Sequence, residues 1–348
     1  MMRAAKTFFL CTLLILTLAQ TSACRSAPPE AAAKKTLRLE AARIPPNSGR
    51  LPESEFQEVW GYVVAGRERS LKTNYPLSDI VYFGADVDRY GHVVDIPARK
   101  VLANYKGRVH ISITCGSFGL THFILEPDSK ARATFVRELL AAARDYDGLN
   151  IDLEQLPLKD ADNFISFLGE LRAGLGSRVL SVCVPARTEE SKTYNYKKIA
   201  AASDKVFVMA YDEHWSTSKP GPVASMKWCR DVAAYALKTI GAEKLVMGIP
   251  FYGRGWGDKS TSRALVHSTT EGLRKTNGIT EIERENDIPK FKYEVLVTVT
   301  VYFEDDHSLA TRMKMYQDMG INHIGFWRIG QESAGVWNLV RLTRSPVS

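Results

Sequence analysis

The sequence has few cysteines for its length. Only five of its 348 residues are cysteine. Cys11 and Cys24 lie near the N-terminus, and an odd number of three remains, so no disulfide framework is expected. Cys115 and Cys183 lie within apolar runs, which is typical of buried thiols. No cysteine and histidine pair has the spacing of zinc ligands, so the sequence predicts no metal and no cofactor.

Basic runs are also absent. The 46 Lys and Arg residues exceed the 39 Asp and Glu residues, which gives a net charge of +7, but the excess is spread along the chain. This distribution is weak evidence for nucleic acid, which we do not expect as a partner, and is mildly compatible with an anionic polymer. A glycine-rich phosphate loop is missing after the first predicted strand, because "VAGRERS" contains a single glycine.

One apolar run, from Thr7 to about Ala19, follows a basic start. It is too short to span a bilayer comfortably, so a signal peptide over residues 1–23 is favoured over a retained membrane anchor. Small residues precede Cys24, as in the lipobox of bacterial lipoproteins, although Thr21 replaces the usual leucine. Acylation of Cys24 and ordinary cleavage nearby both remain open. Either route predicts an extracytoplasmic protein: periplasmic, in the cell envelope or secreted, with membrane attachment if Cys24 is acylated.

Residues 24–52 are rich in Pro, Ala and charge, which is typical of a flexible tether. From residue 53 to 348 we expect one domain, in which short β-branched runs alternate with helical patterns. Such alternation favours parallel strands with helical crossovers, and eight strands fit a (β/α)8 TIM barrel better than an open sheet. The predicted strands are 59–66, 79–86, 108–115, 148–154, 178–186, 205–212, 244–253 and 323–330. Clear amphipathic helices are predicted at 128–146, 159–176 and 224–241. A strand-like stretch within 257–303 predicts a short β-containing insertion between the seventh strand and its helix.

Catalytic groups of such barrels lie at the C-terminal ends of the strands. The fourth predicted strand ends in "DGLNIDLE", in which period two places Asn150, Asp152 and Glu154 on one face. Burying a row of carboxylates is costly, so the pattern indicates a polar cavity with a function. The other strand ends contribute Tyr62, Tyr211, Asp212, Tyr252, Arg254 and Trp327. Carboxylates, phenols and an indole around one mouth suit a sugar ring, whereas phosphoryl transfer and zinc hydrolysis would need other groups.

Several motifs in the expected order resemble glycoside hydrolase family 18, the chitinase-like family. "DGLNIDLE" is similar to its D-G-x-D-x-D-x-E signature, "MAYD" at 209–212 to its M-x-Y-D, and "GIPFYGR" at 248–254 to its seventh strand. Longer segments such as "AYDEHWSTSKPGPVAS" resemble the branch of spore-cortex peptidoglycan N-acetylglucosaminidases. Two departures are Asn150, where the family signature has aspartate, and "ISITCGS", which keeps the third-strand pattern poorly.

The resemblance implies a retaining mechanism in which the N-acetyl carbonyl of the substrate is the nucleophile. Glu154 would protonate the glycosidic oxygen, Asp152 would orient the acetamido group, and Tyr211 would hydrogen-bond its carbonyl. Burial and the Asp152 charge are expected to raise the pKa of Glu154. Neutral Asn150 is expected to let Asp152 ionise more readily than an aspartate at position 150 would. Trp327 would stack under the sugar, and the further predicted substrate contacts are Asp212, Asn150, Tyr62, Tyr252 and Arg254.

We therefore expect a monomeric glycosidase acting on an N-acetylglucosamine-containing polysaccharide, with peptidoglycan favoured over chitin. A non-catalytic lectin on the same barrel is the main alternative, although such lectins typically lose the terminal glutamate, which is present here as Glu154. An envelope structural lipoprotein is a third possibility. Each residue also has a structural interpretation: Asp152 could cap the next helix, and Tyr211 and Trp327 could be core residues. Asp147 is expected to support the turn into its strand rather than to contact substrate.

Overall fold

The computed structural model describes residues 49–257, 262–295 and 297–343. The predicted signal peptide, Cys24 and most of the predicted tether lie outside the described residues. Within these ranges, no helix is both long enough and apolar enough to cross a membrane.

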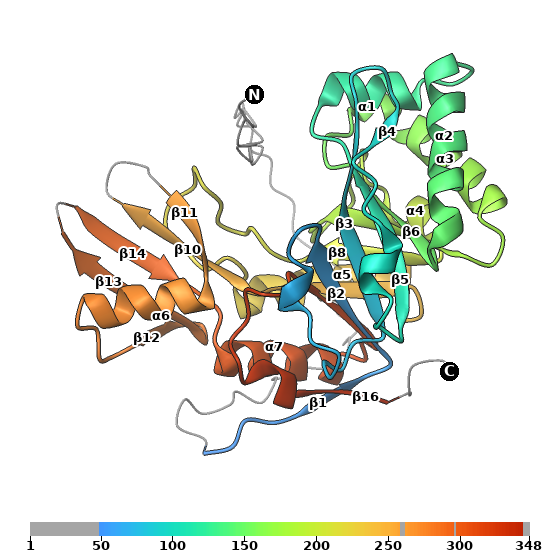
Figure 1. Cartoon of the computed structure of the whole chain (residues 1–348). Helices are drawn as coiled ribbons and strands as arrows, with labels where there is room; N and C mark the ends of the chain where they lie inside the picture. The colour runs from blue at the N-terminus through green and yellow to red at the C-terminus, as the bar shows by residue number, and fades with distance from the viewer. Residues whose placement is uncertain (1–48, 258–261, 296, 344–348) are drawn as a thin grey trace, which may run out of the picture.

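Eight parallel strands form a closed barrel (Figure 1). Their order around the barrel is β2, β15, β9, β8, β7, β6, β5 and β3, and pairing of β2 with β3 closes it. Every predicted strand coincides with one of them, so the (β/α)8 prediction is confirmed. Their bounds are β2 Glu58–Val64, β3 Asp79–Val87, β5 Arg108–Thr114, β6 Gly148–Asp152, β7 Val179–Pro185, β8 Lys205–Met209, β9 Leu245–Pro250 and β15 His323–Trp327.

The helices cover the outside of this barrel, but not evenly. The segments after β2 and β3 contain only the 3-10 turns η1 (Glu68–Ser70) and η2 (Arg99–Leu102), together with the short strand β4 (Val93–Val94). The remaining crossovers are helical, with α1 Phe118–Leu125, α2 Lys130–Ala142, α3 Ala161–Gly174, α4 Tyr196–Ala202, α5 Met226–Ile240 and α7 Asp306–Asp318. Strands β1 (Ser54–Phe56) and β16 (Val340–Leu342) pair in parallel, and further 3-10 turns are η3 Ala143–Asp145, η4 Leu158–Asp160 and η5 Val336–Asn338.

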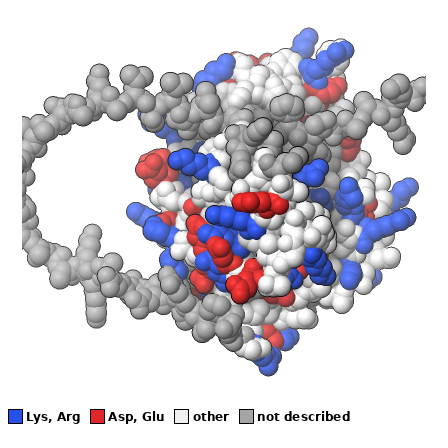
Figure 2. Space-filling model, turned by 90° about the vertical axis from the view of Figure 1, so that its left-hand side faces the viewer, with Lys and Arg blue, Asp and Glu red and all other residues white. Residues whose placement is uncertain are grey.

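An antiparallel five-stranded sheet with one helix is inserted between β9 and α7, as predicted (Figure 1). It begins at Tyr252, earlier than the expected residue 257. Its elements are β10 Tyr252–Gly257, β11 Ser262–Val266, α6 His267–Thr276, β12 Glu283–Glu285, β13 Ile288–Glu294 and β14 Thr298–Tyr302. Figure 2 looks onto the side that carries the insertion, where acidic and basic side chains lie interspersed. Ion pairs such as Lys290 with Glu285 contribute to this mixed surface.

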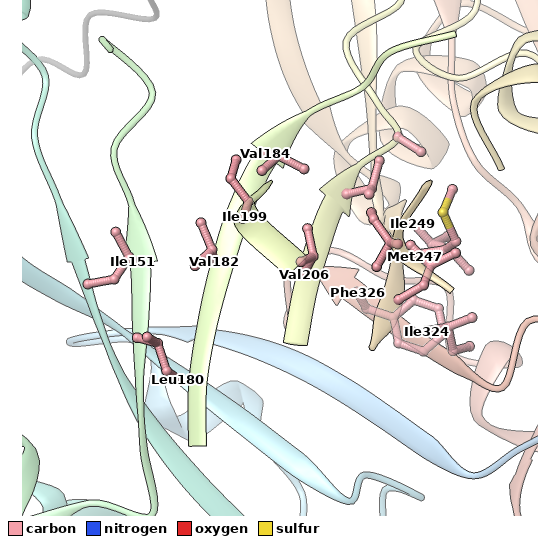
Figure 3. Close-up of a cluster of buried hydrophobic side chains, with 14 of the residues drawn as sticks. Ile151, Leu180, Val182, Val184, Ile199, Val206, Met247, Ile249, Ile324 and Phe326 are labelled. Carbon is pink, nitrogen blue, oxygen red and sulfur yellow. The ribbon is translucent and has the colours of Figure 1, made fainter. Parts of the chain in front are cut away.

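The period of two along each strand separates two layers of core. Outward-facing residues such as Leu149, Ile151 and Leu153 pack with the helices in one large cluster, part of which is shown in Figure 3. A smaller cluster fills the barrel interior and includes Tyr62, Cys183 and Phe207. Gly325 makes room for Phe207, because a Cβ at this position would overlap the Phe207 ring.

The N-terminal end of the barrel is closed by paired charges, which we call the floor: Glu58, Asp79, Arg108, His110 and Lys205. Arg108 donates to Asp79 at 2.7 Å and to Glu58 at 2.8 Å. The His110 ring lies 2.8 Å from Asp79, and Lys205 lies 3.0 Å from Glu58. Burial alone would raise the pKa of Asp79, but His110 and Arg108 lower it to about 2. The floor therefore keeps this buried carboxylate ionised.

Candidate active site

The opposite end of the barrel, which we call the mouth, gathers the predicted site residues. Asp152 is the last residue of β6, and Glu154 follows two positions later. Asn150 and Asp152 are buried on the interior side of the strand, whereas Glu154 is exposed at the rim of the mouth. Asp147, at the other end of this segment, accepts the amide of Val109 in β5 at 2.8 Å, which is a structural role and is consistent with the expectation that it does not contact substrate.

Asn150 is fixed by hydrogen bonds from four directions. Its Oδ1 accepts from Ser112 at 2.9 Å, and its Nδ2 donates to Ser181 at 2.9 Å. The Tyr62 hydroxyl lies 3.4 Å and the Cys183 thiol 3.5 Å from the same Oδ1. Asn150 thus fills its interior position as a neutral, fully engaged group.

Asp152 makes fewer hydrogen bonds than Asn150 does. It is 5% exposed, and its Oδ1 has no hydrogen-bond partner. Burial, followed by the charge of Glu154, raises the pKa of Asp152 well above its usual range, although a hydrogen bond from Cys183 opposes this shift. A buried acceptor without a partner is unfavourable in the free protein and is available to a ligand N–H.

Glu154 also has a raised pKa. Burial of its carboxyl within the mouth is the larger cause, and the charge of Asp212 is the second. The expected raised pKa agrees with the structure, and the charge of Asp212 acts on Glu154 in addition to the expected interaction with Asp152. Because Asp152 and Glu154 influence each other, the two carboxyls titrate as a pair and retain a proton at a higher pH than isolated carboxyls do.

Asp212 lies between the barrel and the insertion. The Tyr252 hydroxyl donates to its Oδ1 at 2.7 Å, and the Arg254 guanidinium lies 3.4 Å from the same oxygen. Both partners belong to β10, the first strand of the insertion. Asp212 has a φ of 58°, in the left-handed region that residues other than glycine rarely occupy. The insertion therefore helps to hold an unfavourable backbone conformation beside Glu154.

Tyr211 and Trp327 supply aromatic surfaces. Tyr211 packs edge-on against Tyr252, with ring centroids 6.2 Å apart. Burial raises the pKa of Tyr211, so its hydroxyl stays protonated and can donate a hydrogen bond. The half-buried Trp327 rests edge-on against Tyr62 at 5.3 Å and Phe83 at 5.0 Å. These contacts fix the plane of the indole at the mouth.

Four residues predicted to contact substrate are nearly fully buried: Asn150, Tyr62, Tyr252 and Arg254. Each hydrogen-bonds or packs against a neighbouring mouth residue, so the structure places them beneath the accessible groups. Ser112, Ser181, Cys183 and Phe83 were missed as members of the site. A polar residue between apolar ones, as in "HISIT" and "LSVCV", is the signal that could have identified the two serines.

Among the described residues, one group of side chains outside the mouth has the composition of a metal site: His122, Glu126 and Asp160. The two ring nitrogens of His122 already face carboxylates, with Nδ1 2.9 Å from Asp160 and Nε2 3.5 Å from Glu126. Asp160 additionally accepts from Asn163 at 3.0 Å. This geometry favours hydrogen bonds over metal coordination.

Comparison with known proteins agrees with this geometry. Residues 61–332 match the sequence model of Glycosyl hydrolases family 18, a range that includes every mouth residue described above. The chain belongs to glycosyl hydrolase family 18. This membership confirms the resemblance identified from "DGLNIDLE", "MAYD" and "GIPFYGR".

Relatives within family 18 include proteins named for spore functions. YdhD of Bacillus subtilis, whose name describes it as a sporulation-specific glycosylase, is 30% identical over 63% of this chain and 56% of its own length. The chain thus matches little more than half of that relative. The cortical fragment-lytic enzyme of Bacillus anthracis is 24% identical over 76% of this chain and 67% of its own. The crystal structure of the spore cortex-lytic enzyme SleL of Bacillus cereus superposes with a TM-score of 0.75 at 21% identity, covering 82% of this chain and 74% of SleL, and supports the fold.

Proposed function

We propose that this protein is a glycosidase that hydrolyses β-1,4 linkages at N-acetylglucosamine in peptidoglycan, by a retaining, substrate-assisted mechanism. The observation that carries the proposal is the pair of carboxyls at the end of β6, both with raised pKa values, beside a family 18 mouth. A carboxyl that keeps its proton near neutral pH can act as a general acid.

In the proposed first step, Glu154 gives its proton to the glycosidic oxygen as the bond from that oxygen to the anomeric carbon breaks. The acetamido carbonyl oxygen of the same sugar attacks the anomeric carbon and forms a cyclic oxazolinium ion. Asp152 accepts a hydrogen bond from the acetamido N–H through its unpartnered Oδ1. Tyr211 donates to the carbonyl and holds it beneath the reacting carbon. Water activated by the now ionised Glu154 then opens the ring, so configuration is retained.

Peptidoglycan is proposed over chitin because relatives are named cortical fragment-lytic and spore cortex-lytic enzymes. These names also support an extracytoplasmic location, in keeping with the predicted signal peptide at 1–23. Attachment to the membrane through acylated Cys24 belongs to the same proposal. The lectin alternative is disfavoured by the presence of Glu154 with its raised pKa, since binding alone does not require a proton donor.

The proposal is tested by incubating the purified protein with cell-wall peptidoglycan and with chitin oligomers. We expect new reducing ends at N-acetylglucosamine from peptidoglycan, identified by mass spectrometry. Proton NMR of the first product should show the β-anomer, and a thiazoline analogue of N-acetylglucosamine should inhibit. Inversion at the anomeric carbon would exclude the mechanism, and tight sugar binding without any cleavage would favour the lectin.

A further inference from the structure

A surface pocket of about 410 Å³ lies beside the mouth, between the loop that follows β6 and the loop that follows β7. One side is formed by Leu158, Ala161 and Ile165. The other side comes from the segment between Glu190 and Lys198, which leads into α4. Helices α3 and α4 pack against each other on the side of the barrel away from the insertion in Figure 1. The volume is within the range of small-ligand sites.

The pocket is held close to the proposed proton donor. The Tyr194 hydroxyl donates to the carbonyl oxygen of Leu153 at 2.7 Å and lies 3.4 Å from the Leu156 amide. This anchors the Glu190–Lys198 segment to the strand end that carries Asp152 and Glu154. Leu158 follows Glu154 by four residues, so their Cα atoms are at most about 14 Å apart.

The chemistry of the pocket differs from that of the mouth. Trp327, Tyr211 and Tyr252 make the mouth aromatic, whereas the pocket lining includes no aromatic side chain. It combines an apolar side with charges of both signs. Lys198 is paired with Asp162 at 2.7 Å, and Glu190 accepts from Asn195 at 3.2 Å. Lys192 has no hydrogen-bond or ion-pair partner among the described residues and is exposed.

We propose that this pocket binds the short peptide stem attached to the glycan strand, with Lys192 pairing with a peptide carboxylate. The inference rests on the proposed function, because it concerns the substrate of that site. Small apolar side chains of the peptide would lie against Ala161 and Ile165, and Glu190 would face its ammonium groups. An extended peptide of four residues spans up to about 14 Å, and the Leu158 Cα lies within that distance of the Glu154 Cα, so a stem held at the mouth can reach this end of the pocket. A neutral polymer such as chitin would leave these charges unused.

The test compares two substrates that differ only in the peptide: glycan strands with intact stems, and the same strands after an amidase has removed them. Wild-type protein should show the higher kcat/KM on stem-bearing strands. Lys192→Ala should lower kcat/KM on those strands by about two- to fivefold, the range expected for an exposed ion pair. Ala161→Phe should fill the pocket and lower it by roughly tenfold. Neither variant should change the rate on stripped strands.

Lys159→Ala is the matched control, because it removes the same charge from the neighbouring loop without lining the pocket. Ligand-observed NMR with a free tetrapeptide measures binding independently of cleavage. Equal cleavage of both strands, unchanged in the variants, would overturn the inference while the proposed function stands. If neither strand is cleaved but the peptide binds and Lys192→Ala weakens that binding by about two- to fivefold, the pocket is supported and the proposed function fails. Absence of peptide binding together with absence of cleavage would overturn both.

Discussion

Carboxylates are buried at both ends of the barrel, under opposite electrostatic conditions. At the floor, Asp79 receives hydrogen bonds from Arg108 and His110, and its pKa falls to about 2. At the mouth, Asp152 has an oxygen without a partner and a carboxyl neighbour, and its pKa rises. Burial acts in the same direction on both residues, so the difference comes from the partners. The paired charges of the floor stabilise the fold. The raised pKa values at the mouth favour protonated carboxyls, which acid catalysis requires.

The largest expected effect is at the mouth. Glu154→Gln removes the proposed proton donor while preserving the shape of the side chain, so kcat should fall by about 10²- to 10⁴-fold. The melting temperature should not fall, because the raised pKa disfavours the ionised carboxyl in the folded protein and the described residues give it no hydrogen-bond or ion-pair partner to lose. Release of reducing ends and calorimetry of the same sample measure both quantities. Glu189→Gln, an exposed glutamate in the loop after β7, is the control; full activity in Glu154→Gln would contradict the assignment.

The next largest effect is expected at the floor, where a substitution should lower stability and leave activity unchanged. Asp79→Asn removes one of the two carboxylates that Arg108 contacts, while Glu58 remains at 2.8 Å and the guanidinium is partly exposed, so the free energy of unfolding should fall by about 1–3 kcal/mol. Activity per folded molecule should be retained, because Asp79 lies at the other end of the barrel. Chemical denaturation measures the loss, with Asp231→Asn in the exposed pair with Lys227 as control. An Asp79→Asn protein as stable as wild type would refute the role of the floor.

Asp152→Asn should have the opposite effects to Asp79→Asn: it should abolish activity and raise stability. The pKa of Asp152 is raised in the folded protein, so its contribution to stability is present below the unfolded pKa and is lost as pH rises through the folded value. The variant has no carboxyl to ionise, so its melting temperature at pH 8 should exceed that of wild type by about 3 °C, the change that roughly 1 kcal/mol produces in a domain of this size. The difference should vanish near pH 4. A lower melting temperature at pH 8 would mean that the Asp152 carboxylate is stabilised by a partner.

The smallest effect is expected at Asn150, the neutral residue that lies between the floor and the mouth. Asn150→Asp adds a carboxyl beneath Asp152 and should raise the pKa of the Asp152–Glu154 pair. The alkaline limb of the kcat/KM profile should move upward by up to about one pH unit. Asn104→Asp, on an exposed loop, should leave the profile unchanged. An unmoved limb in Asn150→Asp would show that Asn150 does not control ionisation of the pair.

Much of this organisation could be predicted from sequence, because strand periodicity is local. All eight barrel strands lie where β-branched runs predicted them, and Asn150 and Asp152 face the interior as period two requires. The strand-like stretch that predicted the insertion lies at 293–303, but its two ends belong to different strands, β13 and β14, which pair antiparallel. "YEVLVTVTV" contains no glycine, proline or asparagine to indicate the reversal.

The hydrogen-bonding and charge partners of the site residues were harder to predict from sequence. Closure of the barrel brings these partners together from strands that are distant in the sequence. Ser112 and Ser181 meet at Asn150 only when β5, β6 and β7 pair in register. The action of Asp212 on Glu154 likewise depends on a backbone conformation that its residue type does not specify. The floor contacts of Asp79 are long-range for the same reason.

The first strand of the insertion, β10, limits which segments of this protein can be exchanged with those of other family members. β10 starts two residues after β9, and its side chains Tyr252 and Arg254 are the hydrogen-bonding partners of Asp212. The inserted sheet is therefore not a separable module, since transplanting it from another barrel would also replace two groups that hold Asp212 in place. Recombination within the family would succeed most readily at boundaries that keep all of β10 with the barrel, because Trp256 also donates to the carbonyl oxygen of Trp215, in the loop after β8, at 3.3 Å.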